Sequence, residues 1–108
     1  MALASNEITQ QTALAMMHDL DNIITRLSAT KMSLSNSSAS LVSFGSTLDP
    51  DSPEMKAIER RRQMLGAFEK QIDAEIQQYQ NRRKMAEGLF EKATHNVDNA
   101  IRRSFMRR

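Results

Sequence analysis

A seven-residue spacing of leucine along the first half of the chain restricts the fold more than any other feature. Such an apolar repeat keeps one stripe of a helix facing a partner helix, as in a coiled coil. The series consists of Ala13, Leu20, Leu27, Leu34, Leu41 and Leu48. The second position of the same stripe is predicted to hold Met16, Ile23, Thr30, Ser37 and Phe44. These positions predict one long amphipathic helix over residues 6–44.

The second half of the chain repeats the pattern. No proline interrupts residues 54–108, so nothing in that segment forces a helix to end. The apolar series there consists of Ile58, Leu65, Ile72, Tyr79, Ala86, Ala93 and Ala100, and Met55, Phe68, Ile76, Phe90, Val97, Ile101 and Phe105 lie beside it. A second long helix is predicted over residues 53–105.

Helix-breaking residues cluster between the two series. Gly45 and both prolines of the chain fall within nine residues, which predicts a turn over residues 45–52. Ser52 is placed to cap a helix whose first residue is Pro53, and Asp51 with Glu54 is the alternative capping pair. A flexible serine-rich linker over residues 28–46 is the alternative to a helix that continues to the turn.

The composition agrees with an all-α fold. Aromatic residues make up only 5% of the chain, and eight methionines predict a thin, adaptable apolar seam that leans on a partner for stability. Residues 1–52 hold two basic and five acidic side chains, whereas residues 53–108 hold 13 basic and eight acidic ones. Opposite net charges of −3 and +5 favour pairing of the two halves. We expect a single domain over residues 1–108, an antiparallel, coiled-coil-like two-helix hairpin.

The two apolar series also predict a register. With the turn near residues 48–49, they should pair as Leu20 with Tyr79, Leu27 with Ile72, Leu34 with Leu65, and Leu41 with Ile58. The first helix would then run out near residue 91, so the C-terminal helix would overhang. Val97, Ile101 and Phe105 are four residues apart and share a face of that overhang. We expect this face, with Arg102 and Arg103, to bind a partner.

Several chemical functions lack the residues that they need. The chain has no cysteine, and neither His18 nor His95 has a second histidine or a carboxylate set at ligand spacing, so no metal site is predicted. The absence of a phosphate-binding loop or a catalytic triad pattern predicts no cofactor and no enzyme. Without a secretory signal or a transmembrane span, the expected location is the cytoplasm or the outside of the cell by a route that needs no signal peptide.

The basic runs of the second half raise the question of nucleic acid. Acidic residues alternate with the first two runs, Arg60-Arg61-Arg62 and Arg82-Arg83-Lys84. No aromatic set is available to stack bases, and both observations argue against RNA or DNA. Arg102, Arg103, Arg107 and Arg108 form a positive terminus without a nearby acid. An acidic partner or an anionic membrane surface is the partner class that this terminus predicts.

Two segments resemble a known family. Pro50-Asp51-Ser52-Pro53 resembles the P-x-x-P turn of bacterial type III secretion needle subunits, and residues 97–105 resemble their C-terminal V-D-x-A-I-x-x-x-F segment. In that family a helical hairpin polymerises into a hollow filament, with the C-terminal helix making contacts between subunits. The resemblance implies a homo-oligomer built through Val97, Ile101 and Phe105.

The sequence therefore predicts a structural, self-assembling helical subunit, such as an exported filament or a component of a secretion apparatus. The alternative is a helical adaptor or export chaperone that binds a partner protein through its C-terminal amphipathic helix. Both functions rest on the same C-terminal face.

Overall fold

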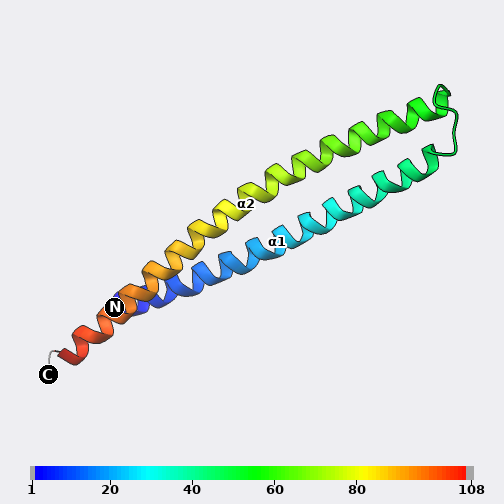
Figure 1. Cartoon of the computed structure of the whole chain (residues 1–108). Coiled ribbons are helices and arrows are strands. Elements are labelled where there is room, and N and C mark those ends of the chain that lie inside the picture. The colour runs from blue at the N-terminus through cyan, green and yellow to red at the C-terminus, as the bar shows by residue number, and fades with distance from the viewer. Residues whose placement is uncertain (1, 107–108) are drawn as a thin grey trace. The chain divides into compact units, whose positions relative to one another are not determined.

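The computed structural model describes the backbone of residues 2–106 and the side chains of residues 9–106. It contains two helices, α1 (Ala2–Gly45) and α2 (Pro53–Met106), joined by the turn at residues 46–52 (Figure 1). The described residues include no strand. The predicted all-α, antiparallel two-helix hairpin is confirmed. Helix α1 begins at Ala2 rather than near residue 6, and Arg107 and Arg108 lie outside the described residues.

The serine-rich segment at residues 28–46 is helical up to Gly45. Its hydroxyl groups find acceptors in the helix itself: Ser33 donates to the carbonyl of Ala29 at 3.2 Å. Ser40 donates in the same way to Asn36 at 3.1 Å. A serine whose hydroxyl bonds one turn back places no unsatisfied polar group in a helix. The linker alternative is therefore wrong.

The turn closes as its residues predict. The Oγ of Ser52 accepts a hydrogen bond from the backbone N–H of Met55 at 3.1 Å, which confirms Ser52 as the helix cap. Gly45 is buried where α1 ends. A Cβ at that position would lie only 3.1 Å from the sulfur of Met55 and 3.6 Å from Ile58. Glycine thus lets the end of α1 approach the start of α2 closely.

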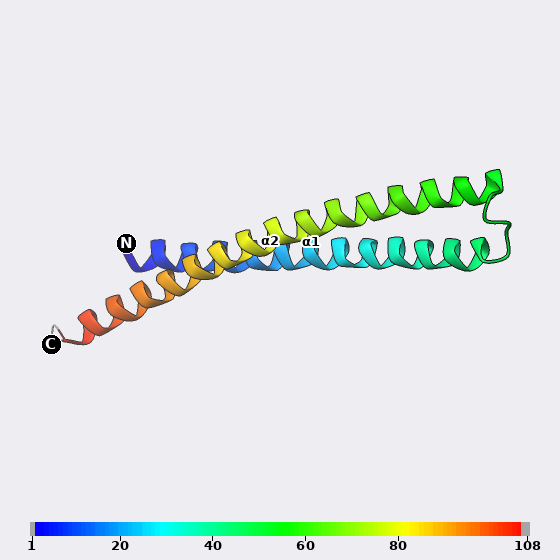
Figure 2. The same ribbon diagram turned by 45° about the horizontal axis from the view of Figure 1, so that its top comes forward.

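The chain divides into two compact units, each made of one stretch of α1 and one stretch of α2. Unit 1 consists of Met1–Ile24 and Gln78–Arg108, and unit 2 is Thr25–Gln77, which includes the turn. In Figure 2 each stretch of α1 can be followed beside its own stretch of α2. Polar side chains join the helices within each unit. The interhelical pairs are Gln10 with Thr94 and Asp21 with Arg83 in unit 1, and Lys31 with Asp73 and Ser35 with Glu69 in unit 2.

These pairs correct the predicted register. The residue numbers in each pair add to 104, whereas the predicted leucine pairs add to 99. In the structure Leu20 shares a groove with Ala86 rather than pairing with Tyr79, and Leu41 shares one with Leu65. Both series still meet, but about one heptad further along α2.

A seven-residue repeat aligns equally well after a slide of seven residues, so the apolar spacing alone does not select between the two registers. Charge does. In the predicted register Lys31 would lie level with Phe68, and Asp21 would lie level with Gln78. The observed register gives each of these charged side chains a partner of opposite sign.

The point on α2 beyond which α1 no longer covers it was also predicted wrongly. Ala93 is buried, and Thr94 accepts a hydrogen bond from Gln10, so α1 does not run out near residue 91. Val97 is half-buried, and every residue from Ile101 to Met106 is exposed. The exposed end of α2 is therefore shorter than the overhang that the sequence predicts.

The second position of the α1 seam differs from the prediction as well. Met16, Ile23 and Phe44 are 43%, 36% and 60% exposed, so they lie outside the seam. The α1 positions that are covered in their place each lie three residues before a member of the leucine series. They are Gln10, Met17, Ile24, Lys31, Ser38 and Gly45. Polar residues at half of these positions hide the seam from a search for apolar periodicity.

The core between the helices is thin. Its buried apolar residues are Ala13, Ile58, Ala86 and Ala93, and none of the large described side chains is fully buried. Two helices offer only one layer of side chains each, so one contact surface cannot enclose a large residue on all sides. Much of the apolar surface of each unit therefore remains open.

Candidate interaction surface

One flank of the seam is polar in both units. Asp21 and Ser35 directly follow leucines of the α1 series, and such positions lie on a single flank of a paired helix. The Nε of Arg83 lies 2.6 Å from Asp21 Oδ1, and its Nη1 lies 3.4 Å from Glu87. Ser35 donates a hydrogen bond to Glu69 at 3.2 Å. We call this flank, with all four interhelical pairs, the polar side.

The ion pairs of the polar side change the proton affinity of their cations. A hydrogen bond to Asp73 at 2.7 Å, and then the charge of that carboxylate, raise the pKa of Lys31 above its ordinary value of 10.5. The pKa of Arg83 is likewise raised, mainly by its hydrogen bond to Asp21. Both cations thus keep their charge across the physiological range, and both pairs are partly exposed to solvent. They specify the register more than they add stability.

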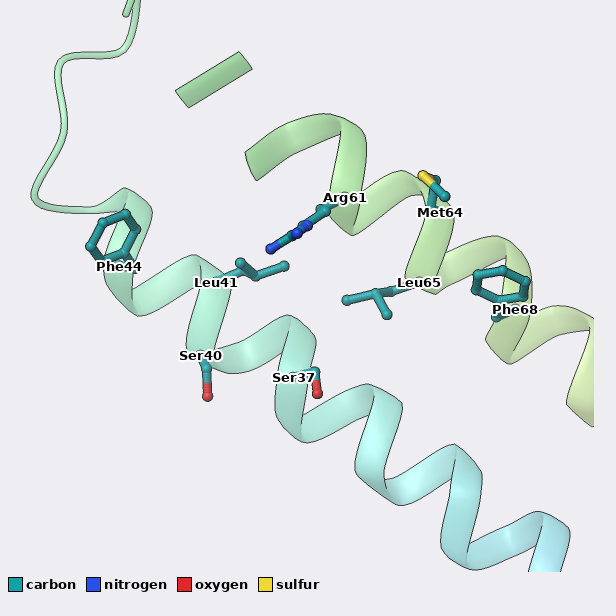
Figure 3. A pocket seen from close by; sticks show the side chains of 8 residues that line it. All are labelled: Ser37, Ser40, Leu41, Phe44, Arg61, Met64, Leu65 and Phe68. Atoms are coloured by element: carbon teal, nitrogen blue, oxygen red, sulfur yellow. The ribbon is translucent and has the colours of Figure 1, made fainter. Parts of the chain in front are cut away.

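The opposite flank of unit 2 is an apolar groove of about 640 Å³. Figure 3 shows Leu65 and Arg61 extending from α2 toward α1, and Leu41 extending toward them. Phe44, Met64 and Phe68 are 60%, 59% and 49% exposed there. The lining residues are Ser37, Ser40, Leu41 and Phe44 from α1, and Arg61, Met64, Leu65 and Phe68 from α2. We call this the unit 2 groove.

Unit 1 carries a second groove, of about 350 Å³, on the corresponding flank. Met85 and Leu89 are 71% and 49% exposed in it. Its lining residues are Met16, Asp19 and Leu20 from α1, and Arg82, Met85, Ala86 and Leu89 from α2. Each of these positions differs from a lining position of the unit 2 groove by 21 residues. We call it the unit 1 groove, and both grooves together the grooved side.

The 21-residue offset reflects an internal repeat of α2. Arg61-Arg62-Gln63-Met64 recurs as Arg82-Arg83-Lys84-Met85, and an aromatic or aliphatic residue follows four residues later in each copy. Three heptads separate the copies, so both place arginine, methionine and the large apolar residue on the same flank of the seam. The grooved side escaped the sequence analysis because Met16, Phe44 and Phe68 were assigned to the seam. This short repeat was the signal that could have revealed it.

The residues predicted to bind a partner lie at the end of α2, within unit 1. Phe105 is 70% exposed and Ile101 is 42% exposed, whereas Val97 is half-buried. Arg102 and Arg103 are exposed. The structure therefore separates Val97, which is partly covered, from the other four, which are open to solvent.

The described residues hold neither a cluster of metal-ligating side chains nor a candidate membrane span. Among the side chains that the structure describes, no three His, Cys, Asp or Glu gather in a way that could hold a metal ion. The rings of His18 and His95 lie beside asparagines one turn further on, at 3.5 Å and 3.1 Å. Within residues 2–106, neither helix has an apolar stretch of the length that a bilayer requires.

Comparison with protein families, with characterised proteins and with solved structures found no match to this chain.

Proposed function

We propose that the protein is a structural, self-associating helical subunit. The observation that carries this proposal is the pair of exposed apolar grooves beside a core made of three alanines and one isoleucine. Contiguous exposed apolar surface on a soluble chain is characteristic of a surface that binds another protein. A helix pair with so little buried apolar area gains stability when another layer of helices covers it.

The surface area supports the same proposal. The chain exposes 8422 Å² for a mass of 12.3 kDa. A folded monomeric protein of that mass exposes about 6,100 Å² on average. The difference of about 2,300 Å² exceeds the ~800 Å² that each partner buries in an interface of standard size. Association can thus remove a large area from water without any change of fold.

Sedimentation velocity over a micromolar to millimolar concentration series tests self-association. The proposal predicts a sedimentation coefficient that rises with concentration, in the absence of any other protein. A single monomeric species over the whole range would contradict it.

The finer proposal is that the assembly is an exported filament or a component of a secretion apparatus. Its support is the resemblance of residues 50–53 and 97–105 to needle subunits, together with the exposure of Ile101 and Phe105. A filament needs a head-to-tail contact that does not close on itself, and the end of α2 is available for one. Negative-stain microscopy of concentrated protein should show filaments, and Ile101→Ala or Phe105→Ala should shorten or abolish them. Discrete small particles at every concentration would exclude the filament.

The alternative function is a helical adaptor or export chaperone. The apolar and basic residues exposed at the end of α2, Ile101, Arg102, Arg103 and Phe105, favour it, because an amphipathic helix with a free apolar face docks into grooves of other proteins. Pull-down with the full chain and with a chain that ends before Val97 separates the two functions. Loss of one heterologous protein on truncation supports the adaptor, whereas recovery of the chain itself alone supports the self-associating subunit.

A further inference from the structure

The grooved side has two walls of different character. In unit 2 the α1 wall contributes the small side chains of Ser37 and Ser40 next to Leu41 and Phe44, and the α2 wall places the bulky Met64 level with Ser40. In unit 1 the α1 wall carries the acidic Asp19, and the α2 wall carries Arg82. The α1 wall thus complements the α2 wall in size at Ser40 and Met64 of unit 2, and in charge at Asp19 and Arg82 of unit 1.

The charge of the two helices agrees with this complementarity. Helix α1 holds three acidic and two basic residues, a net charge of −1, and α2 holds 11 basic and eight acidic residues, a net charge of +3. If like walls met, the arginines of two α2 walls would face each other, and repulsion would oppose the contact. Contact between α1 of one chain and α2 of another brings opposite charges together.

We infer that the grooved side binds a second copy of the chain, with the α1 wall of each copy against the α2 wall of the other. This inference rests on the proposed self-association and specifies its surface. A two-fold axis relates the copies, so each wall is used once by each copy and the contact closes as a dimer. In each unit two helices of one copy then pack on two helices of the other, which is the layer arrangement of a four-helix bundle.

Specific contacts follow from the register. Ser40 and Met64 occupy the same level in unit 2, since their numbers add to 104 as those of the bonded pairs do. Met64 of one copy is therefore placed against Ser40 of the other. In unit 1 Arg82 of one copy lies within one helical turn of the level of Asp19 in the other, which an arginine side chain can span.

Disulfide trapping between copies tests this arrangement, because the chain has no cysteine of its own. A Ser40→Cys chain is mixed in equal amounts with a Met64→Cys chain of different mass, and the mixture is oxidised mildly at a concentration where the wild type associates. We expect disulfide-linked dimers to be mostly of one chain of each type, well above the share that random pairing gives. Dimers of Ser40→Cys with itself should be rare, since two α1 walls do not meet.

Sedimentation of the same variants, with their cysteines reduced, separates the two levels of the proposal. If the variants associate but the trapped dimers are random, or no dimer is trapped, the inferred arrangement is overturned while self-association stands. If neither the wild type nor the variants associate, both are overturned. Circular dichroism confirms that each variant has the wild-type helix content, which is expected because both substituted positions are exposed.

Discussion

The polar side and the grooved side flank the same seam but have different roles: the first joins α1 to α2, and the second exposes apolar surface. On the polar side, hydrogen bonds and ion pairs join α1 to α2 at four levels, from Gln10 with Thr94 to Ser35 with Glu69. On the grooved side, apolar side chains such as Met64 and Met85 remain more than half exposed. Polar groups that already bond each other within the chain have fewer free donors, acceptors and charges for another molecule. Association is therefore expected on the grooved side.

The two sides also differ in how much their contacts can contribute to stability. Exposed ion pairs contribute little to the free energy of unfolding, because water screens them. Burial of a large apolar side chain contributes about 1.5–3 kcal/mol. The polar side therefore selects which residues face each other, and the seam and the grooved side hold the area that can stabilise the fold and its assembly.

The largest effect on folding should come from the seam that both sides flank. Ile58→Ala removes a side chain that is 7% exposed and should lower the free energy of unfolding by about 2–5 kcal/mol. Ile23→Ala, a matched change at a 36% exposed position outside the seam, should cost less than about 1 kcal/mol in dilute protein. Urea unfolding measures both. Equal losses would mean that the seam position contributes no more to stability than an exposed one.

A designed disulfide tests the register that the polar side selects. Ala13 and Ala93 are buried at matching levels of unit 1, so Ala13→Cys with Ala93→Cys should form an intrachain bridge and stabilise the fold by about 2–4 kcal/mol. The control joins Ala13→Cys to Ala86→Cys, which is one heptad away and equally buried. Preferential bridging of the control pair would restore the register predicted from the leucines.

Exchange of charges on the polar side should have a smaller effect. Lys31→Asp alone brings two carboxylates together, and Asp73→Lys alone brings two ammonium groups together, so each should lower the urea midpoint. The double exchange should recover most of the loss, because the pair is restored in reverse. Additive losses in the double variant would show that the pair does not interact in solution.

The smallest effect concerns pH. Because the pKa of Lys31 is raised in the folded state above its ordinary value of 10.5, its stabilisation is complete below that pH and is lost as pH rises through the folded pKa. The difference in unfolding free energy between the wild type and Lys31→Met should therefore stay constant from neutral pH to about pH 9. It should shrink at higher pH. A difference that grows with pH would have the wrong sign for this pair.

The sequence alone predicted the helices and the turn well, because their signals are local. Seven-residue spacing, a single cluster of helix breakers and a serine placed to cap α2 each act within a few residues. The register was missed by about one heptad, because two repeats with the same period fit at several offsets. Only long-range pairs such as Lys31 with Asp73 distinguish these offsets.

The grooved side was missed for a related reason. Met16, Ile23 and Phe44 look like seam residues, since apolar side chains three residues after a member of the leucine series satisfy the heptad rule as well as those three residues before a member do. The structure instead places Lys31 and Ser38 in the covered column, where their polarity conceals the pattern. What sequence reasoning took for core is in large part exposed surface.

The most direct test of the difference between the two sides compares two methionines of unit 2. Met64 is 59% exposed in the unit 2 groove, and Met32 is 68% exposed outside it. Dissociation constants for self-association are measured by sedimentation equilibrium on Met64→Glu and Met32→Glu, with helix content checked by circular dichroism. The structure predicts that Met64→Glu weakens association at least about tenfold, or about 1.4 kcal/mol, while Met32→Glu leaves it nearly unchanged. Equal weakening by both variants, or weakening by Met32→Glu alone, would contradict a grooved side that binds a second copy.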